Sequence, residues 1–207
     1  GRIVGPGTTF APDAGAVVGV MTAANRPEDA YLYCTGSLIA PDAALTAAHC
    51  VADQAKGLVL VNATEDPSCG TASDAEVVPW KRSDLYVHPR YTGGGVHDLA
   101  IIHLNFPVTS VVPAPLGLRR GVEKRCKQGE IFGWGDTDNR GTSDSKPCLL
   151  RKAEVPMWSV KKCKQKRKEQ WSSIDCKREC SETVCAGEVN PSSSGRNKPG
   201  TNTCFGD

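Results

Sequence analysis

The sequence predicts an all-β protein, and two observations lead to that prediction. Its 207 residues include 21 Gly and 14 Pro, a composition typical of short elements joined by tight turns rather than of long helices. The first half also contains a series of short apolar segments separated by turn residues, which is the spacing of a β-sandwich or barrel. The predicted strands read AVVGVMTA, YLYCTGSLIA, AALTAAHCV, GLVLVNA, DLYVHP and DLAIIHL.

The second half returns to the strand pattern after a proline-punctuated stretch, VTSVVPAPLGL, with the segments EIFGWG and KAEVPMW. We therefore expect two lobes that meet near Val112, the first over residues 1–112 and the second over residues 113–207. The segment VKKCKQKRKEQW, residues 160–171, is rich in good helix formers and predicts a short surface helix.

The charge distribution argues against a nucleic-acid-binding protein, and the lack of long apolar runs argues against a membrane protein. Residues 1–100 carry 6 Lys/Arg against 11 Asp/Glu, and residues 101–207 carry 19 against 12, without the dense basic stripe of a dedicated nucleic-acid binder. No apolar run approaches the roughly 20 residues of a membrane span, and the N-terminal segment lacks the pattern of a signal peptide. We therefore expect a soluble chain that is processed or incomplete, with neither nucleic acid nor membrane as a partner.

Six Lys/Arg lie within the eight residues 161–168 of the predicted helix. The simpler interpretation is a solvated helix face, and the alternative is a docking patch for an acidic partner such as a sulfated glycan.

Ten cysteines in a chain of this length predict a disulfide framework and therefore a secreted protein. The glycosylation sequon Asn62-Ala63-Thr64 agrees with secretion. The alternative is a structural zinc site, but its four candidate ligands lack the paired C-x2-C spacing of a metal knuckle. We therefore expect neither a metal nor a cofactor. The candidates are Cys163, Cys176, Cys180 and Cys185.

Two segments about fifty residues apart carry side chains suited to acid–base chemistry. Residues 45–50, LTAAHC, place His49 at the end of an apolar strand, and residues 97–104, HDLAIIHL, place Asp98 at the start of another. A buried carboxylate must be paired, and an imidazole is its natural partner. We therefore expect a ring nitrogen of His49 within about 2.6 to 3.2 Å of the Asp98 carboxylate.

These segments and several others, in this order, resemble the trypsin-like (chymotrypsin-fold) serine endopeptidases, and the resemblance spans the whole chain. It implies two packed six-stranded antiparallel β-barrels, the second of them incomplete here. The motifs are RIVG at residues 2–5, TAAHC at 46–50, DLAIIHL at 98–104, GWG at 133–135, VCAG at 184–187 and CFGD at 204–207.

The resemblance assigns a role to each residue of the catalytic machinery. It implies that His49 is the general base, that Asp98 orients its ring, and that the backbone N–H of Gly206 is one oxyanion donor. In the family the nucleophilic serine follows the position matched by Asp207, where this chain ends. We therefore expect an incomplete catalytic domain, without peptidase activity as the 207-residue chain.

The resemblance also implies how the enzyme is activated and which substrates it selects. Cleavage between Arg2 and Ile3 would free an amine that pairs with Asp207. Asn202 matches the base of the primary specificity pocket, where a trypsin-type enzyme carries Asp. Because Asn is neutral, we expect cleavage after uncharged residues rather than after Arg or Lys.

The resemblance further implies a set of disulfides. Family partners for Cys126 and Cys204 would lie beyond residue 207, and sequence alone does not settle the connectivity of the remaining cysteines. The expected pairs are Cys34 with Cys50, Cys163 with Cys185, Cys176 with Cys180, and Cys69 with Cys148.

The sequence thus predicts a secreted serine endopeptidase, acting on protein or peptide substrates and open to protease inhibitors. Two alternatives remain. A non-catalytic protease homologue would keep the fold and act as a binding or regulatory module. A disulfide-rich glycan-binding module would use the basic segment at residues 161–168, but it would explain none of the motifs.

Overall fold

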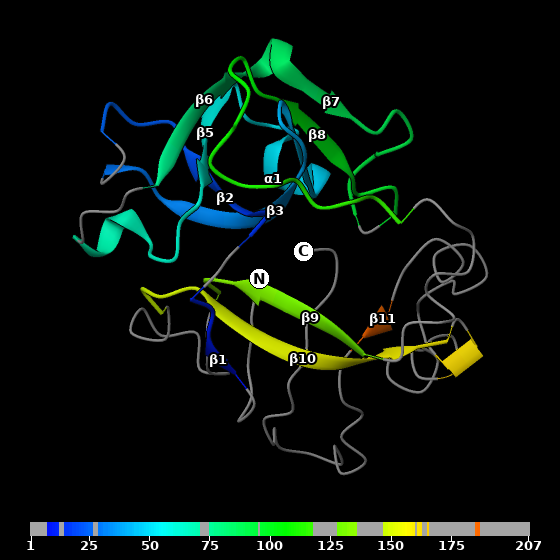
Figure 1. Cartoon of the computed structure of the whole chain (residues 1–207). Coiled ribbons are helices and arrows are strands. Elements are labelled where there is room, and N and C mark those ends of the chain that lie inside the picture. Colours follow the sequence, from blue (N-terminus) through cyan, green and yellow to red (C-terminus); the bar gives the residue numbers. More distant parts are fainter. Residues whose placement is uncertain are drawn as a thin grey trace, which may run out of the picture.

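The computed structural model describes two antiparallel β-sheets, one above the other in Figure 1, with little helix. The described residues are 8–12, 15–26, 29–70, 75–94, 96–117, 128–135, 147–159, 161–162, 165 and 185–186. Among the described residues, none of the helices has the length and apolar character of a membrane span.

The larger sheet has seven strands in the order β6-β5-β2-β3-β4-β8-β7 and curls into a half-barrel (Figure 1). Neighbouring strands of this sheet are antiparallel. The strands are β2 (Val17–Thr22), β3 (Leu32–Ala40), β4 (Ala43–Thr46), β5 (Lys56–Val61), β6 (Glu76–Lys81), β7 (Leu85–Val87) and β8 (Ala100–His103).

In the smaller sheet β10 (Arg151–Trp158) is the central strand. It pairs with β1 (Thr9–Phe10), β9 (Gln128–Gly133) and β11 (Cys185–Ala186). The strand β1 therefore joins the second sheet although it lies near the N-terminus. Three short helical turns complete the described elements: α1 (Ala48–Val51), η2 (Pro67–Cys69) and η3 (Arg82–Asp84).

Two hydrophobic clusters hold these sheets together. The first fills the inside of the curled sheet and includes the fully buried Leu38, Val59 and Ile102. The second joins the two sheets: it contains Leu60 on β5 and Leu150 directly before β10, both fully buried, and Phe132 on β9 packs against it. Burial of apolar surface is the dominant favourable term in folding, so the second cluster ties the two sheets into one unit.

A short backbone ladder reinforces that union. The N–H of Leu150 donates to the Thr64 carbonyl, and the N–H of Asp66 donates to the Cys148 carbonyl, each at 2.7 Å. Residues 65 and 149 form a β-bridge between these bonds. A disulfide between Cys69 and Cys148 closes the same junction.

The all-β prediction is confirmed, with differences in detail. The two-residue strands β1 and β11 were not among the predicted strands. The predicted strand over residues 43–51 ends at Thr46, and α1 follows it. The strand β6 was not predicted, because Pro79 lies inside it; the strand is an edge of the sheet, where a residue without an N–H is tolerated.

Two other predictions fall mainly on residues outside the described ranges. Of the expected helix at 160–171, only Lys161, Lys162 and Gln165 are described, and all three are helical. The division into lobes near Val112 stays a prediction.

We predict that Ile102→Ala destabilises the protein by about 2 to 5 kcal/mol. Its side chain is fully buried in the core of the larger sheet, whereas the neighbouring Ile101 is only partly buried. Ile101→Ala is therefore the matched control and should cost less in chemical denaturation. Equal losses, or a larger loss at Ile101, would contradict this assignment of the two faces of β8.

Candidate active site

His49 lies on α1, a single helical turn that begins two residues after β4 ends. The turn buries Ala48, Cys50 and Val51 in the core and leaves the His49 side chain 41% exposed. The preceding Thr46 is buried, and its hydroxyl donates to the Thr35 carbonyl at 3.1 Å. The core thus fixes α1, while the imidazole faces outward.

Asp98 lies in a tight turn just before β8. The residue before it, His97, has a left-handed backbone with φ of 57°. The N–H of Leu99 donates to the His97 carbonyl at 2.9 Å, so the chain turns around Asp98 within three residues. The Asp98 side chain is only 7% exposed.

Both oxygens of the Asp98 carboxylate contact His49. Oδ1 accepts the backbone N–H of His49 at 2.8 Å, and Oδ2 lies 2.7 Å from the ring Nδ1. The first bond satisfies an N–H at the start of α1, whose N-cap residue, Ala47, supplies no side-chain cap. The second favours the tautomer that carries its proton on Nδ1, which leaves Nε2 as an acceptor.

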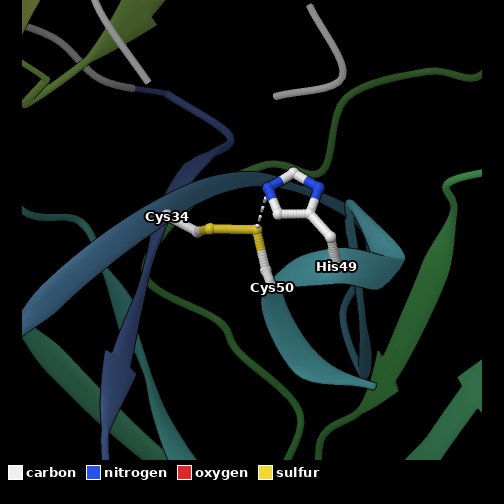
Figure 2. Close-up of side chains that lie close together, drawn as sticks. All are labelled: Cys34, His49 and Cys50. Carbon is white, nitrogen blue, oxygen red and sulfur yellow. Dashed lines mark hydrogen bonds between the residues drawn. A yellow bond between two sulfur atoms is a disulfide. The ribbon is translucent and has the colours of Figure 1, made fainter. Parts of the chain in front are cut away.

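A disulfide lies directly beneath the imidazole. Cys34 on β3 and Cys50 on α1 are bridged, and Figure 2 shows the His49 ring over their sulfur atoms. Nε2 of His49 lies 3.5 Å from Sγ of Cys50. These three side chains have the types and the proximity of a metal site, but the disulfide occupies both sulfurs, and a metal requires the thiolate.

The negative charge of Asp98 also affects the pKa of Tyr91, which lies in the loop between β7 and β8. The pKa of the Tyr91 hydroxyl is raised, first by desolvation and then by the negative charges of Asp98 and Asp53. Both causes disfavour the phenolate. Tyr91 therefore stays neutral beside the carboxylate.

The structure brings together three of the predicted pairs: His49 with Asp98, Cys34 with Cys50, and Cys69 with Cys148. Cys185 on β11 pairs through its backbone with Trp158 on β10. The side chain of Cys185 is not among those described. The remaining predicted site residues lie outside the described residues, as do the cysteines of the zinc alternative other than Cys185. Those site residues are Arg2, Ile3, Cys163, Asn202, Gly206 and Asp207.

One contact beside the site was not predicted from the sequence. The rings of His88 and His97 stack with centroids 4.8 Å apart and planes 11° apart. His88 lies near the end of the predicted strand DLYVHP, and His97 directly precedes the predicted strand DLAIIHL. An antiparallel pairing of these strands places the two residues in the same region, but the strand pattern does not give the ring contact.

The basic segment shows one described contact. The Lys162 ammonium lies 4.9 Å from the ring centroid of Trp158, a cation–π arrangement. Docking of an acidic partner on this segment stays a prediction.

Comparison with protein-family models identifies the fold that presents this site. The family model for trypsin matches residues 8–198. The chain belongs to the trypsin family. The predicted resemblance is thereby confirmed.

Individual relatives agree with this assignment. The trypsin of Saccharopolyspora erythraea is 28% identical over 86% of this chain and 69% of its own length. The lectizyme of Glossina austeni is 28% identical over 64% of this chain and 49% of its own. Proproteinase E of Bos taurus is 30% identical over 74% of this chain and 59% of its own. The chain thus spans only about half to two thirds of the length of these relatives.

We predict that non-reducing peptide mapping links Cys34 to Cys50 and Cys69 to Cys148, since the structure confirms both expected pairs. The bridges close loops of 16 and 79 residues. In the chain-entropy account, removing them by paired alanine substitutions costs about 3 and about 4.5 kcal/mol. A free thiol at any of these four positions in the folded protein would contradict the pairing.

Proposed function

We propose that this protein is a secreted serine endopeptidase that hydrolyses peptide bonds by a Ser-His-Asp mechanism. The observation that carries the proposal is the Asp98 carboxylate, which is almost fully buried and has both oxygens on His49, at 2.8 and 2.7 Å. Family membership supplies the reaction class.

In the proposed mechanism His49 is the general base. A serine hydroxyl is a weak nucleophile near neutral pH and needs an adjacent base of suitable pKa, which imidazole provides. With its Nδ1–H donating a hydrogen bond to Asp98, the ring keeps that proton, accepts the serine proton at Nε2 and later passes it to the leaving amine. Asp98 keeps the ring in this tautomer and stabilises the imidazolium formed on the way.

The proposed nucleophile is the serine that in the family follows the position of Asp207. Support comes from residues 204–207, CFGD, which resemble the start of the nucleophile loop. In this assignment the backbone N–H of Gly206 is one donor to the oxyanion. The amine of Ile3, freed by cleavage after Arg2, would pair with Asp207 and order the loop.

Secretion is the remaining part of the proposal. The two disulfides of the described chain are of the kind that forms and persists in oxidising compartments. The sequon residue Asn62 is exposed at the end of β5 and has a left-handed backbone with φ of 55°. An exposed turn is the setting in which an N-linked glycan is accommodated.

We predict that His49→Ala lowers kcat by about 10⁶-fold and that Asp98→Asn lowers it by about 10⁴-fold. The test protein is the chain extended through the family's nucleophile loop and cleaved between Arg2 and Ile3. His103→Ala is the matched control, because the His103 side chain is 64% exposed and its Nε2 lies 3.7 Å from an Asp42 carboxylate oxygen, away from the His49–Asp98 pair. A peptidase assay on one peptide series measures all three variants.

Full activity in the Asp98→Asn variant would contradict the proposed role of the pair. A folded and cleaved wild-type protein that hydrolyses nothing would favour the non-catalytic homologue instead.

We predict further that the same protein cleaves after uncharged residues faster than after Arg or Lys. Asn202 offers no negative charge to a cationic side chain, and Asn202→Asp should shift the preference towards Arg and Lys. Values of kcat/KM on peptides that differ only in the residue before the scissile bond measure this preference. A wild-type preference for Arg would overturn the assignment of Asn202 to the pocket.

A further inference from the structure

The stacked pair His88 and His97 lies at the base of the loop that ends in Asp98. His88 directly follows β7, His97 directly precedes Asp98, and the two rings are nearly parallel. Nearly parallel rings at this separation are in van der Waals contact across the loop. The contact therefore joins the two ends of the loop through side chains.

His88 is held at three points. Its N–H donates to the Leu99 carbonyl at 2.9 Å, and its own carbonyl accepts the N–H of Tyr91 at 2.9 Å. The ring Nδ1 accepts the backbone N–H of Arg90 at 3.2 Å. Backbone and ring are thus both fixed, so His88 presents a flat and immobile face to His97.

His97 needs such a support. Its backbone is left-handed, a conformation that costs energy for any residue with a Cβ, although histidine is among the residues found there more often. The conformation matters because the next residue is Asp98, whose carboxylate must reach both the N–H and the Nδ1 of His49. A relaxed backbone at His97 would redirect that carboxylate.

The rest of the loop gives little help. Gly93 and Gly94 have positive φ angles of 88° and 90°, and an added Cβ at either would meet nothing within 4 Å. Glycines in open space leave the chain with many accessible conformations. Among the described residues of the loop, the contacts that can restrain the backbone before Asp98 therefore lie at its base.

We propose that His88 and His97 are positioning residues for Asp98: the stack holds His97 in its left-handed conformation and so aims the carboxylate at His49. The inference rests on the proposed function for its effect on catalysis, but not for its structural effect. Neither ring touches the reacting atoms in this assignment, and both act through the backbone of the turn around Asp98.

The test changes His88 rather than His97, because His97 also carries the left-handed backbone. His88→Ala removes the stacked ring, and His88→Phe restores a flat ring while losing the Nδ1 acceptor. In the His88→Phe variant the backbone N–H of the exposed Arg90 can donate a hydrogen bond to water instead. His103→Ala serves as the control, since the chain contains only four histidines and this one lies at the far end of β8.

The first readout is the resonance of the His49 Nδ1 proton, which ¹⁵N–¹H NMR detects in the 207-residue chain. A proton shared with a buried carboxylate is protected from exchange with water, so we expect its resonance in the wild type and in the His103→Ala variant. We expect the resonance to be lost in His88→Ala and recovered in His88→Phe. A resonance unchanged in His88→Ala would overturn the proposal, and loss in both His88 variants would assign the effect to the Arg90 bond instead of the stack.

The second readout is kinetic, in the extended and cleaved protein. A positioning role predicts that His88→Ala lowers kcat by at least about tenfold with KM changed less than about twofold, and that His88→Phe recovers most of the loss. A change in KM alone would overturn the role in catalysis. If all versions are inactive while the NMR pattern is as expected, the proposed function fails and the positioning of Asp98 stands.

Discussion

The arrangement of the site depends on a single buried carboxylate. Asp98 is almost shielded from water, and a buried charge is tolerable only when it is fully hydrogen-bonded. Both of its oxygens find their partners on one residue, the backbone N–H and the ring Nδ1 of His49. The carboxylate therefore completes the first turn of α1 and orients the imidazole at the same time. Displacing either α1 or the turn before β8 would leave the Asp98 charge without its hydrogen bonds, so these two segments are held together.

The surroundings of this pair restrict it further. The core of the curled sheet packs against the buried face of α1, and the Cys34–Cys50 disulfide ties the same turn to β3. The ring of His49 is thus held by a carboxylate at Nδ1 and lies against a disulfide on the side of Nε2. A preorganised base loses little energy to reorganisation during reaction. The second cluster and the Cys69–Cys148 bridge then attach the smaller sheet to this unit.

Much of the fold could be predicted from the sequence, because short apolar runs separated by turn residues are compatible with few structures other than β-strands. The strand β6 was missed since Pro79 interrupts its pattern, and only its position at the sheet edge makes that residue acceptable. The end of β4 was placed too late because Ala47 and Ala48 read equally well as strand or helix. Tertiary contact decides between them: the Asp98 carboxylate caps the helical alternative.

The proximity of His49 and Asp98 was also accessible from sequence, because a buried aspartate at the start of an apolar strand needs a partner. The stacked histidines were not, since their contact depends on the register of β7 with β8 and on the left-handed backbone at His97. Such a backbone is set by the turn as a whole and leaves no mark in the residue pattern. The loop conformation that aims a site is therefore harder to predict than the residues that compose it.

In the proposed mechanism the His49–Asp98 pair activates a serine that follows Asp207. Its most direct test is mass-spectrometric mapping after treatment of the extended, cleaved chain with a serine-directed covalent phosphonate probe. We expect one adduct, on the serine that follows Asp207, and strongly reduced labelling when Asp98 is replaced by Asn. A folded wild-type chain that takes up no probe, or an adduct on another residue such as Ser37, would contradict it.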